Sequence, residues 1–212
     1  MNKTPTVSAI IVAAGESRRM NGIDKVLALL EGQPVILRSA RPFQDCPLVR
    51  QIVLVVNAGN RKTCREIATG KDWSKVSGVC LGGRRRQDSV LAGLKEIKDS
   101  EWVIIHDGAR PLVTIDLITT GLEAAKETGA AVAAVPVTDT IKQVDRDEIV
   151  IQTLPRQNLR AIQTPQVFRT DILLKAYQQA HGDVTDDAMI VEQAGYKVKL
   201  YMGSYENIKI TR

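Results

Sequence analysis

Short runs of apolar residues recur along the chain, separated by segments with a different spacing. The runs contain almost no polar residues, a pattern typical of strands that are buried on both faces of a parallel sheet. They cover residues 7–14, 51–56, 102–106 and 130–135. Elsewhere apolar residues recur three and four positions apart, which predicts helices over residues 34–43, 88–97, 115–128, 170–181 and 185–194. This alternation predicts a three-layer α/β/α sandwich with a mostly parallel sheet.

The alternation breaks after Pro136. Two short alternating segments, residues 140–144 and 149–153, flank a polar turn at residues 145–148, which predicts a β-hairpin that projects from the sheet. A lone hairpin is only marginally stable in water, so we expect it to pack on its own domain or on a second subunit. Residues 197–201 read as an edge strand. We therefore expect a single domain over residues 1–212, with an arm at about residues 137–160.

The composition is that of a soluble globular protein. Of the 212 residues, 44% are hydrophobic and 25% are charged, and no apolar run approaches the ~20 residues needed to cross a bilayer. The first residues lack the apolar segment of a secretory signal, so we expect a cytoplasmic protein. Cys46, Cys64 and Cys80 are widely separated, which predicts free thiols rather than a disulfide framework or a zinc site.

The net charge of +5 would suit either nucleic acid or phosphorylated metabolites. Only 4% of the residues are aromatic, and none is interleaved with basic residues as a base-stacking surface requires. Nucleic-acid binding therefore has little support.

The first candidate site follows the first predicted strand. Residues 13–20 read Ala-Ala-Gly-Glu-Ser-Arg-Arg-Met, and Lys25 comes shortly after them. Small residues at the carboxyl end of a strand let backbone N–H groups approach a phosphate, and Arg19 and Lys25 would add positive charge. The segment matches neither the G-x-G-x-x-G fingerprint nor the Walker A pattern. A tight turn with a solvated basic face explains this segment equally well.

A second cluster, residues 82–89, lies between an apolar run and a predicted helix. It contains two glycines, which free the backbone to meet a ligand, and three consecutive arginines. Ser89 is placed either to cap the helix or to hydrogen-bond a nucleotide. Three consecutive arginines most often form a solvated face, so the sequence alone does not single out Arg86 as a ligand.

A third cluster, residues 106–111, reads His-Asp-Gly-Ala-Arg-Pro. Asp107 is a candidate ligand for Mg²⁺ or a ribose hydroxyl, and Arg110 is a candidate for a phosphate. His106 ends an apolar run, which favours a packed core histidine over a base. No nucleophile is paired with a base in the sequence, so a covalent mechanism has no support.

Together the three clusters resemble those of nucleotidyltransferases that join a nucleoside triphosphate to a sugar or polyol phosphate. Later motifs narrow the resemblance to the 2-C-methyl-D-erythritol 4-phosphate cytidylyltransferase family, which makes 4-diphosphocytidyl-2-C-methyl-D-erythritol from CTP in the non-mevalonate pathway of isoprenoid biosynthesis. These motifs are Pro136-Val137-Thr138-Asp139-Thr140-Ile141-Lys142, Arg156, Gln163-Thr164-Pro165-Gln166, Val184-Thr185-Asp186-Asp187 and Glu206-Asn207-Ile208-Lys209-Ile210-Thr211. Each is weak alone, but their order along essentially the whole chain is specific.

The resemblance implies a Rossmann-like nucleotidyltransferase fold, a homodimer, and Mg²⁺ or another divalent cation as cofactor. Arg19 and Lys25 match the pair that stabilises the transition state. The positions expected to bind CTP are Ala13, Ala14, Gly15, Gly83 and Ser89. The resemblance also favours Arg86, over Arg84 and Arg85, as a substrate-binding residue. The positions expected near the methylerythritol phosphate are Asp107, Arg110, Thr140, Arg156, Thr185 and Lys209. Of these, Arg156 and Lys209 would position the phosphate, and Asp107 would contact the metal or the substrate.

In this family the hairpin arm reaches across a homodimer, which would place Thr140 and Arg156 in the partner's site. The sequence departs from the family at Asp24, where many relatives have proline. That departure bears on the rigidity of the loop and not on the identity of Lys25.

Three alternatives have other sequence requirements. Ribitol-5-phosphate cytidylyltransferase has the same fold and chemistry but resembles this chain less at residues 107–111. A sugar-phosphate enzyme that uses UTP or GTP is more distant. A catalytically silent nucleotide-binding regulator would keep Gly15 and Gly83 but would not need Arg19, Lys25 and Lys209.

Overall fold

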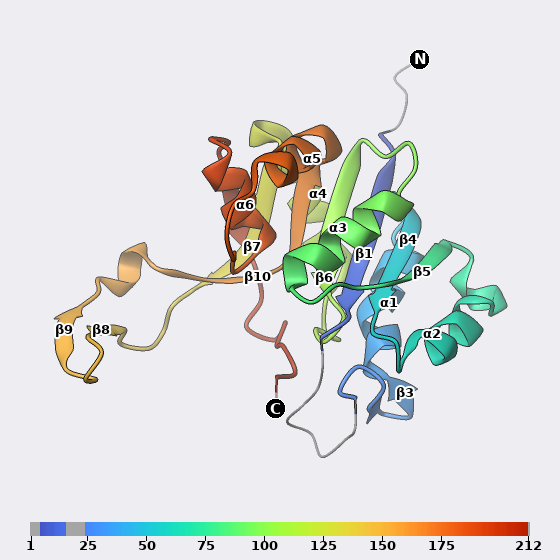
Figure 1. The fold of residues 1–212 in the computed structure, drawn as a ribbon, viewed down its shortest axis with the longest axis horizontal. Helices are drawn as coiled ribbons and strands as arrows, with labels where there is room; N and C mark the ends of the chain where they lie inside the picture. Colours follow the sequence, from blue (N-terminus) through green and yellow to red (C-terminus); the bar gives the residue numbers. More distant parts are fainter. Residues whose placement is uncertain (1–4, 16–23, 212) are drawn as a thin grey trace.

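The centre of the molecule is a seven-stranded sheet with the strand order β11-β7-β10-β6-β1-β4-β5 (Figure 1). The computed structural model describes residues 5–15 and 24–211. The sheet strands are β1 (Val7–Ala13), β4 (Val49–Val56), β5 (Val76–Leu81), β6 (Trp102–Asp107), β7 (Ala130–Pro136), β10 (Arg160–Arg169) and β11 (Lys199–Met202). Neighbouring strands are parallel, except that β10 runs antiparallel to β6 and β7. The predicted mostly parallel sheet is confirmed.

Helices cover both faces of this sheet. One face carries α1 (Val35–Asp45), α2 (Arg61–Ala68) and α4 (Ile115–Thr128), and the other carries α3 (Arg86–Glu96), α5 (Thr170–Gln179) and α6 (Asp187–Gln193). Successive side chains of a strand point to opposite faces, so Ile10 and Ile11 enter different cores, and both are fully buried. Burial on two faces explains why the central strands are almost continuously apolar. The predicted three-layer sandwich is confirmed.

The ends of α4 agree with its predicted bounds because both carry local signals. The Oγ1 of Thr114 accepts a hydrogen bond from the Leu117 N–H at 3.2 Å, which caps the first turn. Gly129 ends the helix with a φ of 83°, a conformation that favours glycine. Helix α2 was not predicted. Among its residues only Cys64 is buried, so it has almost no apolar stripe to detect.

Strand β10 was also missed, for a physical reason. Its residues 163, 164 and 166 are Gln, Thr and Gln, and all three are buried. These polar side chains interrupt the apolar pattern, and the ladder with β7 shifts register between Ile162 and Gln166. The same three polar residues line a pocket at the edge of the sheet.

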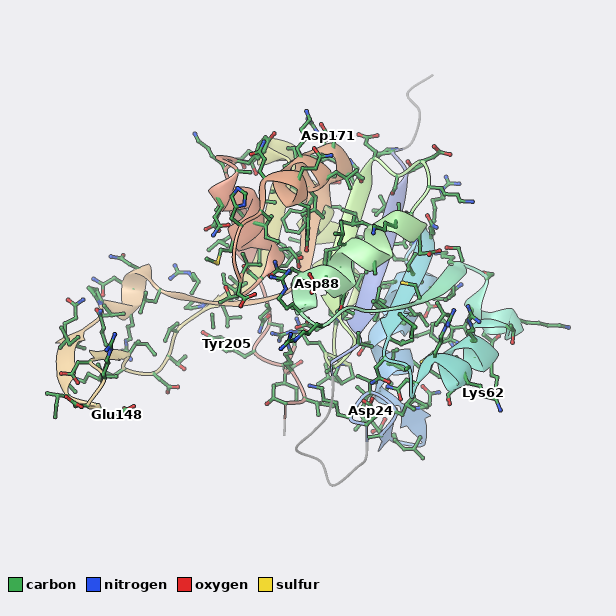
Figure 2. All side chains as sticks on the ribbon, viewed as in Figure 1. Asp24, Lys62, Asp88, Glu148, Asp171 and Tyr205 are labelled. Carbon is green, nitrogen blue, oxygen red and sulfur yellow. The ribbon has the colours of Figure 1, made fainter. Side chains whose placement is uncertain are left out.

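The predicted hairpin is present and projects from the body of the molecule (Figure 1). Strands β8 (Lys142–Val144) and β9 (Val150–Thr153) pair antiparallel in a separate two-stranded sheet, and every residue in them is exposed. A single 3₁₀ turn, η2 (Arg156–Asn158), leads back toward β10. Figure 2 shows Glu148 at the tip of this arm, well away from Tyr205 near its base. Among the strands that the structure describes, β8 and β9 pair with each other alone.

The smaller elements are β2 (Leu29–Leu30), β3 (Gln33–Pro34) and η1 (Lys71–Trp73). The three cysteines are free thiols, as predicted. Among the described residues, none of the helices is both long and apolar enough to cross a membrane.

A candidate active site at the carboxyl edge of the sheet

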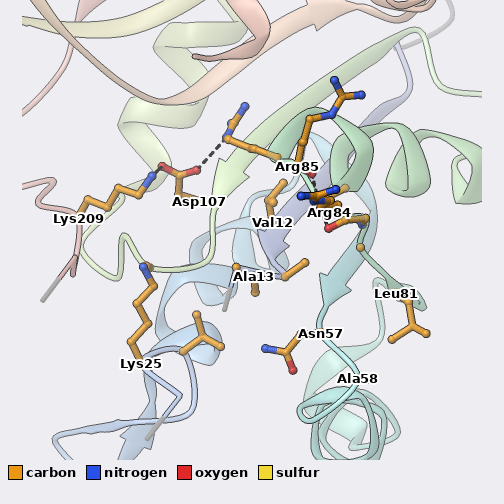
Figure 3. A pocket seen from close by; sticks show the side chains of 18 residues that line it. Val12, Ala13, Lys25, Asn57, Ala58, Leu81, Arg84, Arg85, Asp107 and Lys209 are labelled. Atoms are coloured by element: carbon orange, nitrogen blue, oxygen red, sulfur yellow. Dashed lines mark hydrogen bonds and ion pairs between the residues drawn. The ribbon is translucent and has the colours of Figure 1, made fainter. Parts of the chain in front are cut away.

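A pocket of about 680 Å³ opens where β1, β4, β5 and β6 end (Figure 3). Carboxyl ends of parallel strands are the usual ligand site in open α/β sheets. The described lining residues are Val12, Ala13, Ala14, Gly15, Lys25, Val26, Asn57, Ala58, Leu81, Gly82, Gly83, Arg84, Arg85, Arg86, Ser89, Asp107, Ala109 and Lys209. The structure thus brings the described parts of the three predicted clusters together at one cavity.

Small residues bring the backbone close together at the floor of the pocket. A Cβ atom on Gly82 would lie 2.2 Å from the Cβ of Ala14, a separation that real side chains cannot adopt. The Ser89 hydroxyl accepts a hydrogen bond from the Gly83 N–H at 3.2 Å and lies 3.1 Å from the Arg85 carbonyl oxygen. Ser89 is buried and fastens the glycine-rich turn to α3, while its hydroxyl remains on the pocket lining.

The three consecutive arginines have different environments. Arg85 forms ion pairs with Asp88 at 2.8 Å and with Asp183 at 3.0 Å on the exposed surface. Arg86 turns inward, where its Nη1 lies 2.5 Å from the buried Asp187. Only Arg86 of the three lines this pocket and a second one behind it. The geometry therefore supports the choice of Arg86 as the arginine of the site.

Asp107 is the electrostatic centre of the site. Its carboxylate lies 2.9 Å from Lys209 Nζ, 3.4 Å from Arg110 Nε and 3.5 Å from Arg86 Nε. Burial alone would raise the pKa of Asp107, but the charges of Arg86 and Lys209 outweigh burial and hold it well below its ordinary value. Figure 3 shows Lys209 reaching Asp107, with Lys25 on the same side of the pocket and Arg84 and Arg85 across it.

His106 is a core residue, as predicted. It is fully buried against Phe43, and burial lowers its pKa to about 4. Its Nε2 donates to the Arg110 carbonyl at 3.1 Å, since a carbonyl can only accept. Its Nδ1 is therefore the acceptor for the Thr164 hydroxyl at 3.0 Å. The same hydroxyl accepts a hydrogen bond from the Asp107 N–H at 3.0 Å, so the neutral imidazole orients the site instead of exchanging protons.

A second pocket of about 600 Å³ lies toward β10, α6 and β11. It shares Arg86, Asp107 and Lys209 with the first pocket, and Arg110 and Thr185 line it as well. Arg110 is nearly buried, and its Nη1 donates to the Asn207 carbonyl at 2.7 Å. The cluster of Arg86, Asp107 and Lys209 thus borders both cavities.

Lys25 stands on a segment fixed by its neighbour. The Asp24 carboxylate accepts hydrogen bonds from the Val26 N–H at 3.1 Å and from the Asn57 side-chain amide at 2.7 Å. It also accepts one from the side-chain amide of Asn60, which is buried. These bonds supply the restraint that a proline would give to this position. Arg19, the other predicted transition-state residue, lies outside the described residues.

Thr140 and Arg156 are not part of either pocket of this chain. Both lie exposed in the arm, where Arg156 Nη1 donates to the Thr138 carbonyl at 2.7 Å. Their action in a partner's site, as the family resemblance implies, stays a prediction.

One carboxylate is available for a metal ion in the larger pocket. Asp107 is the single acidic side chain among its described lining residues. In residues 5–15 and 24–211, no group of three or more His, Cys, Asp or Glu residues is arranged to hold a metal. This donor set fits Mg²⁺ that takes most of its ligands from substrate phosphates and water, and it does not fit a cage built by the protein alone.

Sequence reasoning missed three contributors to the site. Asn57 follows β4 as Asp107 ends β6, so a polar residue at the end of an apolar run was the available signal. The buried Asp187 and the half-buried Tyr177 form a group behind Arg86. Asp187 belongs to the Val184-Thr185-Asp186-Asp187 motif, but nothing in the sequence indicates its partner.

Comparisons with known proteins agree with this geometry. Residues 7–212 match the profile of the family described as 2-C-methyl-D-erythritol 4-phosphate cytidylyltransferase. A protein of that name from Dehalococcoides mccartyi is 50% identical over 97% of this chain and 90% of its own length. One from Alkaliphilus metalliredigens is 44% identical over 97% of this chain and 88% of its own length.

Solved structures give the same result. The 4-diphosphocytidyl-2C-methyl-D-erythritol synthase from Anaerococcus prevotii superposes with a TM-score of 0.85 at 29% identity, covering 99% of this chain and 94% of that one. The 2-C-methyl-D-erythritol 4-phosphate cytidylyltransferase from Thermus thermophilus gives a TM-score of 0.79 at 31% identity, covering 98% and 93%. On the strength of its motifs, its site and these relatives, the chain belongs to the 2-C-methyl-D-erythritol 4-phosphate cytidylyltransferase family.

Proposed function

We propose that the two pockets divide the two substrates of the reaction between them. The protein is a cytidylyltransferase that joins a cytidylyl group from CTP to 2-C-methyl-D-erythritol 4-phosphate in isoprenoid precursor biosynthesis. CTP occupies the larger pocket and the polyol phosphate enters through the second. The observation that supports this division is the cluster of Arg86, Asp107 and Lys209, which lines both cavities. The ribitol-5-phosphate alternative is not favoured, because the family profile and the relatives name the methylerythritol enzyme.

The larger pocket suits a nucleoside triphosphate. Its floor of small residues exposes backbone groups at the end of β1, where N–H groups can meet phosphate oxygens. Lys25 and Lys209 bring cationic ends to the same cavity. Backbone groups near Ala14 and Gly83 would accept the cytosine amino hydrogen. UTP would present a carbonyl there, leaving two acceptors facing each other, which we expect to lower kcat/KM by about 10⁴ or more.

The reaction brings two anions together. An oxygen of the methylerythritol phosphate attacks the α-phosphorus of CTP in line, a new P–O bond forms, and the bond to pyrophosphate breaks. No general base is needed, since the attacking monoester is already ionised near neutral pH. Lys25, together with Arg19, neutralises the negative charge that builds on the α-phosphate. Lys209, together with Arg156 of the partner subunit, would position the incoming phosphate, and Arg110 lines the pocket that receives it.

A divalent cation, Mg²⁺ first among the candidates, would enter with the triphosphate, and Asp107 would hold it from the protein side. When bound, such a cation neutralises charge on the phosphate oxygens. Because Asp107 pairs with three cationic side chains, it would exchange one of them for the metal. Both substrates are charged, phosphorylated metabolites, so we expect the enzyme to work in the cytoplasm.

The exposed arm supports a homodimer as part of the proposal. Every residue of β8 and β9 is exposed, and Val144, Val150 and Ile151 are large apolar side chains among them. Ile149, just before β9, is a fourth exposed apolar side chain of the arm. Such a surface is stabilised by a partner. A second copy of this chain would cover it and would receive Thr140 and Arg156 in its own site, which makes the enzyme a homodimer.

A coupled pyrophosphate-release assay tests the function. We expect release with CTP and 2-C-methyl-D-erythritol 4-phosphate, much slower release with ribitol 5-phosphate or with UTP, and loss of activity in EDTA that added Mg²⁺ restores. Equal kcat/KM for the two polyol phosphates would contradict the substrate assignment. Equal kcat/KM for CTP and UTP would contradict the base pocket.

A further inference from the structure

A buried carboxylate lies directly behind the site. Asp187, in the first turn of α6, is only 1% exposed. One of its oxygens lies 2.5 Å from Arg86 Nη1, and the other accepts a hydrogen bond from the Tyr177 hydroxyl at 2.7 Å. Neither Asp187 nor Tyr177 is among the described residues that line the two pockets. Of the described side chains that hydrogen-bond or ion-pair with Asp187, Arg86 is the one that lines the cavities.

The contacts hold this carboxylate in one orientation. A buried charge is costly unless it is paired and hydrogen-bonded, and each Asp187 oxygen has its own partner. Burial and the negative charge of Asp187 raise the pKa of Tyr177 well above its ordinary value, so the phenol keeps its proton and remains a donor. The tyrosine thereby fixes the carboxylate from the side opposite the arginine.

Arg86 is consequently held between two carboxylates. Its Nη1 contacts Asp187 at 2.5 Å, whereas its Nε lies 3.5 Å from Asp107. The shorter contact is to the residue outside the pockets, and the longer one is to the residue inside them. An entering phosphate can therefore replace the Asp107 contact while Asp187 keeps the guanidinium in place. Since Arg86 lines both pockets, its side chain borders the region where the two substrates would meet.

We propose that Asp187, supported by Tyr177, is a positioning residue that fixes the Arg86 guanidinium at the boundary of the two pockets, where it contacts phosphate oxygens of both substrates. This inference rests on the proposed division of the pockets. Arg86 is the contacting residue, and Asp187 acts only through it. Misplacing such a group by an ångström is sufficient to slow a reaction by about two orders of magnitude.

The test is a double-mutant cycle on kcat/KM in the pyrophosphate assay. We expect Asp187→Asn to lower kcat/KM by about 10- to 100-fold in the wild-type background. In an Arg86→Gln background the same change should lower it less than about threefold, because the guanidinium that it positions is already gone. Tyr177→Phe should follow the same pattern with a smaller effect, and it tests the proposal if Asp187→Asn does not fold.

Two matched controls separate positioning from general stability. Asp183→Asn removes an exposed carboxylate that pairs with the neighbouring Arg85, and we expect kcat/KM to stay unchanged. Tyr201→Phe removes another buried tyrosine hydroxyl, which donates to the Pro165 carbonyl at 3.0 Å. This change should lower Tm, but its effect on kcat/KM should be the same with and without Arg86→Gln. All variants are compared below their Tm.

The outcomes distinguish this inference from the proposed function. If wild-type protein releases no pyrophosphate from CTP and methylerythritol phosphate, the function itself is wrong. If wild-type protein is active but Asp187→Asn and Arg86→Gln multiply their effects, Asp187 is a structural residue and the positioning proposal is overturned.

Discussion

The Lys209 ammonium lies 2.9 Å from the Asp107 carboxylate, although the two residues belong to segments far apart in the sequence. The backbone on both sides of Lys209 is hydrogen-bonded to the loop that follows β6. The Asn207 carbonyl accepts from Arg110 at 2.7 Å, and the Ile210 N–H donates to the Ala109 carbonyl at 2.8 Å. The fold therefore fixes the backbone on both sides of Lys209, and the ion pair with Asp107 fixes the end of its side chain.

Acid should weaken the protein partly through Asp107. Its folded pKa is depressed below the ordinary value of 3.8, so its contribution is fully present above that value and is lost as the pH falls toward the folded pKa. One such group changes the free energy of unfolding by at most about 1.4 kcal/mol per pH unit. We expect Tm measured from about pH 6 to about pH 2.5 to fall more steeply for wild type than for Asp107→Asn. Parallel curves would show that Asp107 titrates normally.

Lys25→Ala should lower kcat by about 10²–10³ and change the KM for CTP far less, because the charge of Lys25 matters most as charge builds on the α-phosphate. Steady-state kinetics with varied CTP separates the two constants. Lys62→Ala, on the outer helix α2 (Figure 2), serves as the control and should leave both unchanged. A change confined to KM would reassign Lys25 to ground-state binding.

A larger residue should not be tolerated at Gly82, whereas it should be tolerated at Gly78 on the preceding strand. A Cβ on Gly82 would lie 2.2 Å from the Cβ of Ala14 and 2.6 Å from Ser89 Oγ, so Gly82→Ala must push apart the floor of the pocket. A Cβ on Gly78 would meet nothing closer than 3.7 Å. We expect Gly82→Ala to raise the KM for CTP at least tenfold, by ~1.4 kcal/mol of binding, and Gly78→Ala to leave it unchanged. A normal KM for Gly82→Ala would place the nucleotide elsewhere.

Mixing two inactive variants tests the arm. Lys25→Ala has a defective pocket and an intact arm, and Arg156→Ala has the reverse. If Arg156 serves the partner's site, subunit exchange gives mixed dimers in which one site is whole. Half of the dimers are mixed and half of their sites are intact, so about a quarter of wild-type activity should return. No recovery despite verified exchange would show that Arg156 does not act in the partner.

The elements that could be predicted from the sequence are those whose burial produces one clear pattern of apolar residues. Strands β1, β4, β6 and β7 are buried on both faces, which forces apolar runs that the sequence displays. Strand β10 was not predicted because its buried polar residues interrupt the apolar pattern that marks a core strand. The pairing of Asp187 with Arg86 was equally hidden. The two residues are 101 positions apart, and only the folded chain shows that one faces the other.

The way the arm joins the sheet has a mechanical consequence. The chain leaves for the arm from β7 and returns through β10, and these two strands pair with each other at Pro136 and Arg160. The arm is thus joined to the sheet through two paired strands and not through a single connection. One of these strands, β10, also carries Thr164, whose hydroxyl accepts the Asp107 N–H. The arm and the peptide that carries the central carboxylate of the site are therefore both attached to β10.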